Sequence, residues 1–528
     1  MKKLLALILV LVMCVSMFTA CGSKGETADA PSESKQDAPA SEKTEEAAKE
    51  EAPAAVEGKD TLVVAVSTGP GTLDPNKEGI LYTSACLRLV YDGLVRMTKD
   101  NEFVPHLAES YEAISDTEWK FVLRDGLTFS DGTPVTSEDC AASIWATHDS
   151  AVLYPYATWL DKIEIIDDKT FVIHTLEPST RIIYDLSHYH WIIPASTIGC
   201  DYDYDSNPVG TGPYTLVEWQ RGDHLLFEAR EDYFLAEDAA RIKYLDWRIV
   251  PEGISRTIAL QNGEVDFVYD VNATDLPQLE ADENVTVYNA DYCSPFYMAF
   301  NLNNEYLSDI NVRKAVASAI NRENASAVAT NSYSKPINTC FALDLLGSTQ
   351  EYAYGYDVEA AKQYMAEAGY PDGGFTLNVI TKEAVMKTAL ESVQADLKEI
   401  GITLEIELMD GATYTARSAD FDFDMIVGKY GIPDLLIYAQ NAFLTGAPYN
   451  YNGLEDPELD ALINEGFRTI DEAARAEIID QVVEKVDSNV YRTGIYQLTT
   501  TRAFSSKLAG FETTSESKDR FNKMYWAE

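Results

Sequence analysis

The most constraining feature of this sequence is a strand–helix–strand run between residues 375 and 409. Strands are predicted at Phe375–Thr381 and Thr403–Met409. Between them, apolar residues recur with helical spacing over Ala384–Ile400, and Gly401 ends that helix. Strands that alternate with helices in this way predict an α/β domain with a mixed sheet.

A second informative segment, Leu107–Trp145, combines short strands, tight turns and a helix. The side chains of Trp119–Leu123 alternate between apolar and polar, so one face of this strand is apolar. Two Asp-Gly dipeptides follow, and they are typical of tight turns. Thr136 and Asp139 have the spacing of a capping box that opens a helix. Nothing in this segment has the pattern of a catalytic site.

The residues LAESYEAISDTEWKFVLRDGLTFSDGTPVTSED of this segment closely resemble the signature region of a known family. The family comprises the large extracytoplasmic solute-binding proteins that serve oligopeptide, dipeptide and nickel ABC importers. Three further segments resemble it too, namely Asn207–Trp219 (NPVGTGPYTLVEW), Phe296–Arg322 and Tyr356–Gly374. Together the matches extend from Leu62 to about Gly510, which is nearly all of the chain after its leader.

The resemblance implies an α/β, two-lobed periplasmic-binding-protein-like fold of the large, oligopeptide-binding type. Such a fold has two hinge crossings, which we expect near Tyr288–Ser294 and Tyr496–Thr500. Lobe I with a subdomain is expected over residues 61–292 and lobe II over 293–497, and residues 498–528 are expected to return to lobe I.

The N-terminus has the features of an export signal. Residues 1–20 carry two lysines and then the apolar run Leu4–Val15. The following Phe18-Thr19-Ala20-Cys21-Gly22 resembles a lipobox, in which Cys21 is lipidated; an ordinary cleavage site before a cysteine is the alternative. Acyl chains on Cys21 would anchor the protein at the extracytoplasmic face of the cell membrane. Residues 21–60 are rich in Ala, Glu, Lys, Ser and Pro, which predicts a disordered acidic tether.

Composition argues against several other classes of function. The formal net charge is −45, from 41 basic and 86 acidic side chains, so nucleic-acid binding is not expected. The seven cysteines form no CxxC or CxH pair, and HExxH, GxSxG and P-loop motifs are absent from the sequence. We therefore expect neither an enzyme nor a cofactor.

Two patterns are reminiscent of metal sites but give weak support for one. His188 and His190 would share a face if they lay on a strand, yet no third ligand is near them in sequence. The acidic loop from Asp201 begins like an EF-hand, but Ser206 replaces the glycine and Gly212 the final glutamate. A metal is not expected at either place.

Candidate ligand contacts come from the resemblance and from tyrosine chemistry. A strand is predicted at Thr61–Val66 and a helix at Leu81–Met97, and the family places the loop between them beside the ligand, here with Thr68 and Gly69. Tyrosine offers a flat apolar face and one hydroxyl, which suits peptides, sugars and planar ligands. The tyrosines near the predicted cleft loops are Tyr154, Tyr156, Tyr292, Tyr297 and Tyr430.

Lys429 marks a departure from the family's peptide binders. There the segment matching Phe423–Asp434 carries an aromatic residue and then an aspartate that pairs with the peptide's α-ammonium. In one alignment Lys429 takes the position of the acid. In the other, Lys429 takes the position of the aromatic residue and Ile432 that of the acid. In both, Asp434 is the nearest carboxylate. A ligand that meets Lys429 would be anionic, hydroxyl-rich or a blocked peptide at that end. Alternatively, Lys429 points to solvent and another acid anchors the ligand.

These observations predict a monomeric, lipid-anchored binding protein that captures a peptide-like or other medium-sized solute between two closing lobes. Its partners would be the permease and ATPase subunits of an ABC importer. An extracellular hydrolase would need a nucleophile–base pair or a carboxylate dyad, which no motif supplies. A ligand sensor or adhesion module with the same fold is the remaining alternative.

Overall fold

The computed structural model describes residues 60–77, 81–343 and 345–527. The predicted signal peptide, Cys21 and all but the last residue of the predicted tether lie outside these residues. The main element is a mixed sheet with the strand order β15-β14-β16-β12-β17-β11-β1-β10-β9-β8, while β13 pairs with β17 off this path.

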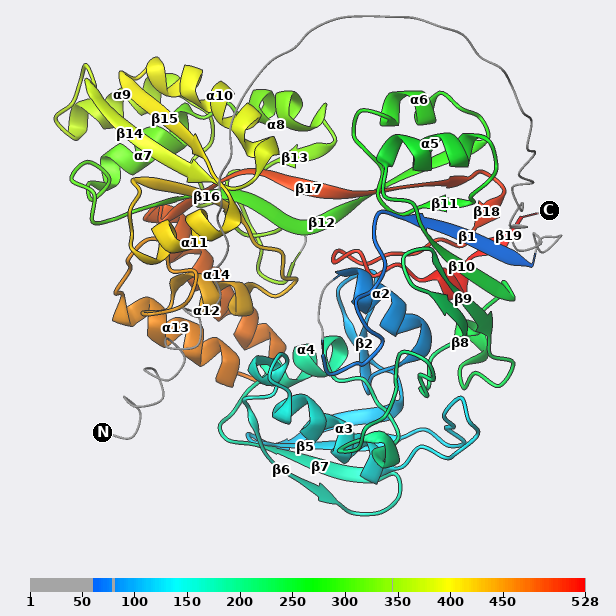
Figure 1. Cartoon of the computed structure of the whole chain (residues 1–528). Helices are drawn as coiled ribbons and strands as arrows, with labels where there is room; N and C mark the ends of the chain where they lie inside the picture. Colours follow the sequence, from blue (N-terminus) through cyan, green and yellow to red (C-terminus); the bar gives the residue numbers. More distant parts are fainter. Residues whose placement is uncertain (1–59, 78–80, 344, 528) are drawn as a thin grey trace, which may run out of the picture. The chain divides into compact units, whose positions relative to one another are not determined.

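Two long antiparallel strands, β12 (Val285–Phe300) and β17 (Arg492–Ser505), lie side by side in the middle of this sheet (Figure 1). Their register shifts between Asp291 and Pro295, opposite Thr499 and Gln497. This irregular point lies within both segments where the sequence predicts a hinge crossing. We call the part of the sheet with β1 and β8–β11 lobe I, and the part with β14–β16 lobe II.

Lobe I is built on β1, which is parallel to its neighbours β10 and β11. Its apolar core includes Leu62, Trp247 and Phe267, and Phe521 and Met524 near the C-terminus complete it. The elements of this part are β1 (Thr61–Val66), α2 (Leu81–Val90), β8 (Tyr214–Gln220), β9 (His224–Ala229), β10 (Tyr244–Ile249), α5 (Gly253–Gln261), β11 (Phe267–Val268), α6 (Leu276–Glu280), β18 (Leu508–Ala509), η4 (Phe521–Lys523) and β19 (Tyr525–Trp526).

A second sheet in lobe I, with the order β4-β5-β7-β6, forms the subdomain. The predicted alternation is present, since Trp119, Phe121 and Leu123 of β5 are buried. Helix α3 begins with the predicted capping box of Thr136 and Asp139. The elements are β2 (Val95–Met97), β3 (Phe103–Pro105), β4 (Ala108–Ser115), β5 (Glu118–Leu123), α3 (Ser137–Asp149), η1 (Tyr154–Tyr156), β6 (Leu160–Ile165), β7 (Thr170–Thr175), α4 (Arg181–His188), η2 (Ala195–Thr197) and η3 (Ala236–Asp238).

The helix predicted over residues 81–97 is too long. Helix α2 ends at Val90, and β2 begins at Val95. Gly93 lies in the turn between them, where an added Cβ would be 3.0 Å from the carbonyl oxygen of Leu186. Leu94 is fully buried in the core of the subdomain and not on α2, so tertiary packing overrides the helical spacing.

Lobe II contains the predicted strand–helix–strand run as β14, α10 and β15, with β14 parallel to β15 and β16. The elements of lobe II are α7 (Ile310–Ala319), α8 (Arg322–Thr330), β13 (Ser334–Pro336), α9 (Val358–Glu367), β14 (Phe375–Thr381), α10 (Ala384–Lys398), β15 (Ile402–Leu408), α11 (Gly411–Ala419), β16 (Met425–Lys429), α12 (Leu435–Phe443), α13 (Pro457–Arg468) and α14 (Glu472–Ser488).

Asp487 of α14 gives lobe II a pH-dependent stability. Its side chain is buried, neither carboxylate oxygen has a hydrogen-bond partner among the described residues, and burial raises its pKa to about 8. An acid with a raised folded pKa stabilises the fold at low pH and loses that contribution as pH rises. The contribution of Asp487 to the free energy of unfolding should therefore decrease from about pH 4 to about pH 8, and Asp487→Asn should remove this part of the pH dependence. Urea unfolding at several pH values tests this, and an unchanged slope in the variant would contradict it.

Candidate functional site

Three cavities lie between residues of lobe I and lobe II. The largest has a volume of about 620 Å³ and is lined by residues that include Tyr111 and Tyr184 of lobe I and Asp434 and Arg475 of lobe II. A second, of about 340 Å³, lies at the strand crossing and is lined by Asp291 and Gln497 among others. The third, of about 150 Å³, separates the subdomain from α12 and α13.

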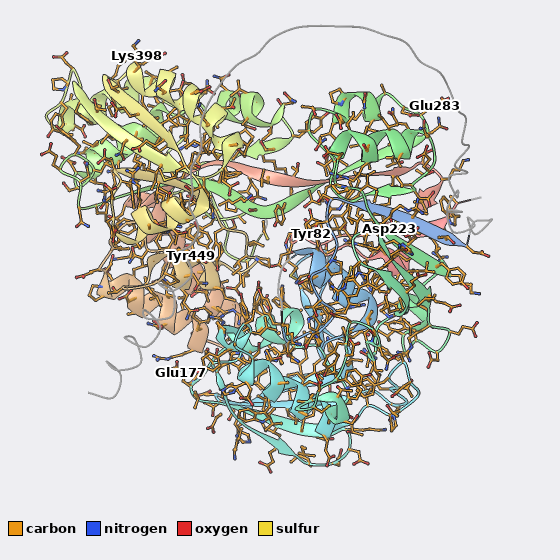
Figure 2. All side chains as sticks on the ribbon, viewed as in Figure 1. Tyr82, Glu177, Asp223, Glu283, Lys398 and Tyr449 are labelled. Carbon is orange, nitrogen blue, oxygen red and sulfur yellow. The ribbon has the colours of Figure 1, made fainter. Side chains whose placement is uncertain are left out.

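Polar contacts join the two lobes beside these cavities. Arg181 of α4 donates a hydrogen bond from Nη1 to Oε1 of Gln440 at 2.8 Å. The backbone N–H of Thr180 donates to the carbonyl oxygen of Phe467 at 2.9 Å. At the exposed rim, Arg468 forms an ion pair with Glu177, which is labelled in Figure 2 beside the helices of lobe II.

Aromatic side chains from both lobes gather at this interface. Tyr156 of η1 stacks on Tyr189 with ring centroids 3.6 Å apart. Tyr430 belongs to lobe II and packs at 5.0 Å from the ring of Tyr449. Burial raises the pKa of Tyr430, and Tyr449 and Tyr156 add to this shift. Neither Tyr156 nor Tyr430 lines the 620 Å³ cavity, so ligand contact by either stays a prediction.

The other predicted tyrosines lie elsewhere. Tyr297 is only 2% exposed, and the guanidinium of Arg492 lies 4.3 Å from its ring centroid inside lobe II. Tyr154 is 49% exposed and packs edge-on against His148. Tyr292 is half-buried at the strand crossing, where burial raises its pKa to about 12. Ligand contact by any of them stays a prediction.

Thr68 and Gly69 follow the carboxyl end of β1, as predicted. The loop begins at Ser67, whose backbone N–H and hydroxyl both donate to Oδ2 of Asp270 at 3.0 and 2.9 Å. Thr68 is exposed, and a Cβ added to Gly69 would lie 2.6 Å from Cδ1 of Ile249. The added Cβ would meet only the end of the Ile249 side chain, which can shift, and Thr68 is the exposed residue of the pair.

Lys429 ends β16 and already has a carboxylate partner in its own lobe. Its Nζ lies 3.4 Å from Oε2 of Glu383, its side chain is 43% exposed, and it lies over the ring of Phe296 at 5.6 Å. This placement favours the alternative in which Lys429 faces solvent and another acid anchors the ligand. Asp434 is such an acid, because it lines the 620 Å³ cavity while its Oδ1 accepts the N–H of Ile437 at the start of α12.

Sequence reasoning missed Arg181 and Arg475 as site residues. Nε of Arg181 forms an ion pair with Oδ2 of Asp185 at 3.0 Å. Burial raises the pKa of the Asp185 carboxyl to about 7. Arg475 lies near the start of α14, lines the 620 Å³ cavity and forms no ion pair within 4.0 Å among the described residues. Neither residue belongs to a motif, and only the packing of distant helices places them at the cavity.

The two histidines considered as metal ligands have other partners. His188 ends helix α4, so the assumption of a strand is wrong, and its Nε2 lies 2.5 Å from Oε2 of Glu516. His190 Nε2 lies 3.1 Å from the carbonyl oxygen of Tyr156. Within the described residues no group of three or more His, Cys, Asp or Glu side chains is arranged to hold a metal ion. Across the same residues, helices long and apolar enough to cross a membrane are also lacking.

The arrangement of two lobes, two long connecting strands and an interlobe cavity defines the class of two-lobed binding proteins. Solved structures with this fold include HbpA2 from Haemophilus parasuis, with a TM-score of 0.82 and 22% identity over 89% of this chain and 100% of that chain. The ABC transporter-associated periplasmic binding protein DppA from Helicobacter pylori, solved in complex with the peptide STSA, matches with a TM-score of 0.71 and 22% identity over 89% and 98% of the two chains.

The family model of the bacterial extracellular solute-binding proteins, family 5, matches residues 102–444, and the chain belongs to this family. Among curated relatives, the glutathione-binding protein GsiB of Pectobacterium atrosepticum is 24% identical over 481 residues, covering 85% of this chain and 91% of the relative. GsiB of Escherichia coli K12 is 27% identical over 373 residues, covering 69% and 72%. The chain is thus a substrate-binding component of an ABC importer of the peptide/nickel family.

Proposed function

We propose that this protein captures a short, peptide-like solute in the 620 Å³ cavity between its lobes and delivers it to the permease of an ABC importer. The feature that supports this most directly is that residues of both lobes line the cavity. Its volume is in the range of pockets that enclose small ligands, about 300–1,000 Å³. The relatives named as glutathione-binding and the neighbour solved with a tetrapeptide support a peptide-like class.

The charges at the cavity suit a zwitterion. Asp434 offers a carboxylate for an ammonium group, and burial raises the pKa of Asp434, so a ligand cation would stabilise its ionised form. Arg475, which has no ion-pair partner among the described residues, offers a guanidinium for a carboxylate. Because the ligand contacts residues of both lobes at once, binding stabilises the closed state.

Arg475→Gln should weaken peptide binding about 10- to 100-fold, since a hydrogen bond to a charged group contributes about 1.5–3 kcal/mol. Titration calorimetry with a mixed library of tri- to pentapeptides measures this. The matched control is Arg468→Gln at the exposed rim, where the ion pair with Glu177 should contribute less than about 1 kcal/mol. Equal affinity of wild type and Arg475→Gln would contradict the assignment of Arg475.

The function itself is tested by scattering and by recovery of the solute. The radius of gyration should decrease when the peptide library is added, and the bound peptide should be recovered chemically unchanged. Absence of any peptide binding by the wild type would reject the peptide-like class. Recovery of a cleaved product would instead indicate a hydrolase.

We also propose that Cys21 carries a lipid anchor and holds the protein at the extracytoplasmic face of the membrane. The lipobox-like Phe18–Gly22 supports this, and two acyl chains give stable attachment where one does not. Cys21→Ala should move most of the protein from the membrane fraction to the soluble fraction, as measured by immunoblotting after fractionation. A variant that stays in the membrane fraction after its leader has been removed would contradict the anchor.

A further inference from the structure

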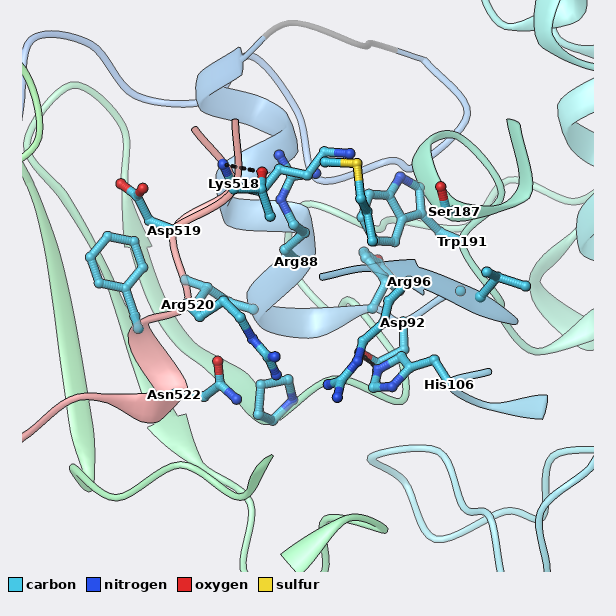
Figure 3. Close-up of a pocket in the computed structure, with 18 of the residues that line it drawn as sticks. Arg88, Asp92, Arg96, His106, Ser187, Trp191, Lys518, Asp519, Arg520 and Asn522 are labelled. Atoms are coloured by element: carbon cyan, nitrogen blue, oxygen red, sulfur yellow. Dashed lines mark hydrogen bonds and ion pairs between the residues drawn. The ribbon is translucent and has the colours of Figure 1, made fainter. Parts of the chain in front are cut away.

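A small chamber of about 100 Å³ lies inside lobe I, apart from the interlobe cavities (Figure 3). Its walls come from α2, β2 and residues 514–522, the segment that returns to lobe I after β17. The volume corresponds to about three water molecules at roughly 30 Å³ each. Four cationic side chains line it: Arg88, Arg96, Lys518 and Arg520.

At one end of the chamber, three cations share a single carboxylate. Asp238, whose side chain is 1% exposed, forms ion pairs with Arg96, with Arg520 at 3.0 Å and with Lys523. Nε of Arg96 is buried and has no hydrogen-bond partner among the described residues. This end therefore carries more positive charge than its own carboxylate can balance.

At the other end, Arg88 and Lys518 lie next to each other (Figure 3). Arg88 forms no hydrogen bond or ion pair with any described residue, and its nearest ring is Trp191, whose centroid is 6.0 Å from Cζ. Lys518 shares Glu516 with His188. Burial lowers the pKa of Arg88, and burial together with the nearby Arg88 lowers that of Lys518 to about 8, which are the shifts expected of buried cations without sufficient counter-charge.

The charges around the chamber do not balance, although the whole chain has a net charge of −45. Five cations and four carboxylates line the chamber or pair directly with a lining residue, which leaves one cation in excess, and Lys523 adds a second through its ion pair with Asp238. The cations are Arg88, Arg96, Arg502, Lys518, Arg520 and Lys523, and the carboxylates are Asp92, Asp238, Glu516 and Asp519.

We propose that this chamber is a binding site for a small inorganic anion of the size of sulfate or phosphate. Such an ion would accept hydrogen bonds from Arg88 of α2 and from Lys518 of the return segment, which lie next to each other at one end of the chamber. It would therefore join the return segment to α2. Because only the folded lobe I assembles the site, the anion stabilises that lobe. The site is separate from solute capture, since neither Arg88 nor Lys518 lines the 620 Å³ cavity.

Titration calorimetry of the full chain with sodium sulfate, at constant ionic strength and without other oxyanions, tests the proposal. We expect saturable binding at one site, weakened at least tenfold by Arg88→Gln or Lys518→Gln. Arg88→Lys keeps the charge, so its affinity for sulfate should lie within about threefold of that of wild type. Such a result would show that the weaker binding of Arg88→Gln is not due to misfolding. The control Arg241→Gln removes the same charge from an exposed position of lobe I outside the chamber and should bind like wild type.

Selenate, which has the shape and charge of sulfate, locates the anion in crystals. An anomalous peak between Arg88 and Lys518 is expected. The proposal is overturned if wild type shows no saturable sulfate binding, if Arg88→Gln and Lys518→Gln both bind like wild type, or if the selenate peak lies outside the chamber.

Discussion

Arg492→Met is expected to lower the free energy of unfolding by about 4 kcal/mol, because Arg492 is buried in lobe II and donates several hydrogen bonds there. Its side chain is 1% exposed, and no carboxylate among the described residues pairs with it. Its guanidinium instead donates to Tyr438 Oη at 3.1 Å and to the backbone carbonyl oxygens of Ala442 and Tyr449. Each buried acceptor left without a donor costs about 1–3 kcal/mol, and methionine fills the space only in part.

Aromatic rings surround the same guanidinium, so the substitution should also loosen the packing of these rings inside lobe II. The centroids of Tyr297 and Phe443 lie 4.3 and 4.9 Å from Cζ of Arg492. Urea unfolding followed by circular dichroism measures the loss. Arg241→Met, at an exposed position, is the matched control and should change stability by less than about 1 kcal/mol. A loss below about 1 kcal/mol in Arg492→Met would show that lobe II packs without its buried cation.

Asp519→Ala is expected to cost about 3–5 kcal/mol, because it leaves a buried guanidinium without its counter-ion. Arg502 of β17 forms an ion pair with Asp519 at 2.6 Å, and the side chains are 7% and 0% exposed. Arg502 also donates to the carbonyl oxygen of Tyr269 at 2.8 Å and lies over that ring. The pair joins β17 to the return segment.

A double-mutant cycle separates the broken pair from the lost volume. Arg502→Met combined with Asp519→Leu removes both charges and keeps most of the packing, so it should be more stable than Asp519→Ala alone. The free energies of unfolding of Arg502→Met, Asp519→Leu and the double variant, measured by urea unfolding, give the interaction free energy. If the double variant were no more stable than Asp519→Ala, the uncompensated charge would not be the cause of the loss.

Much of the fold follows from local sequence signals. The capping box of Thr136 and Asp139 and the strand–helix–strand run of lobe II are local patterns, and both are present as predicted. The prediction that the helix continues to Met97 is wrong, because Leu94 is buried in the core of the subdomain. Helical spacing alone cannot distinguish a face of α2 from the core of the subdomain.

The candidate site was less predictable, because it depends on long-range packing. Tyr156 and Tyr430 are expected from residue type and loop position, but neither lines the 620 Å³ cavity. Tyr297 has the same chemistry but is turned into lobe II, where it packs against Arg492. Lys429 could not be assigned from sequence, since its partner Glu383 is 46 positions away along the chain and follows a different strand.

The position of the return segment also constrains the order in which the protein can fold. The core of lobe I contains Leu62 near one end of the described chain and Met524 near the other, so that core cannot close until the last residues are available. Most of lobe II, in contrast, comes from one continuous stretch of chain. A polypeptide that emerges N-terminus first therefore assembles its second lobe before its first is complete. Loss of the final twenty or so residues should leave lobe I open while lobe II still forms.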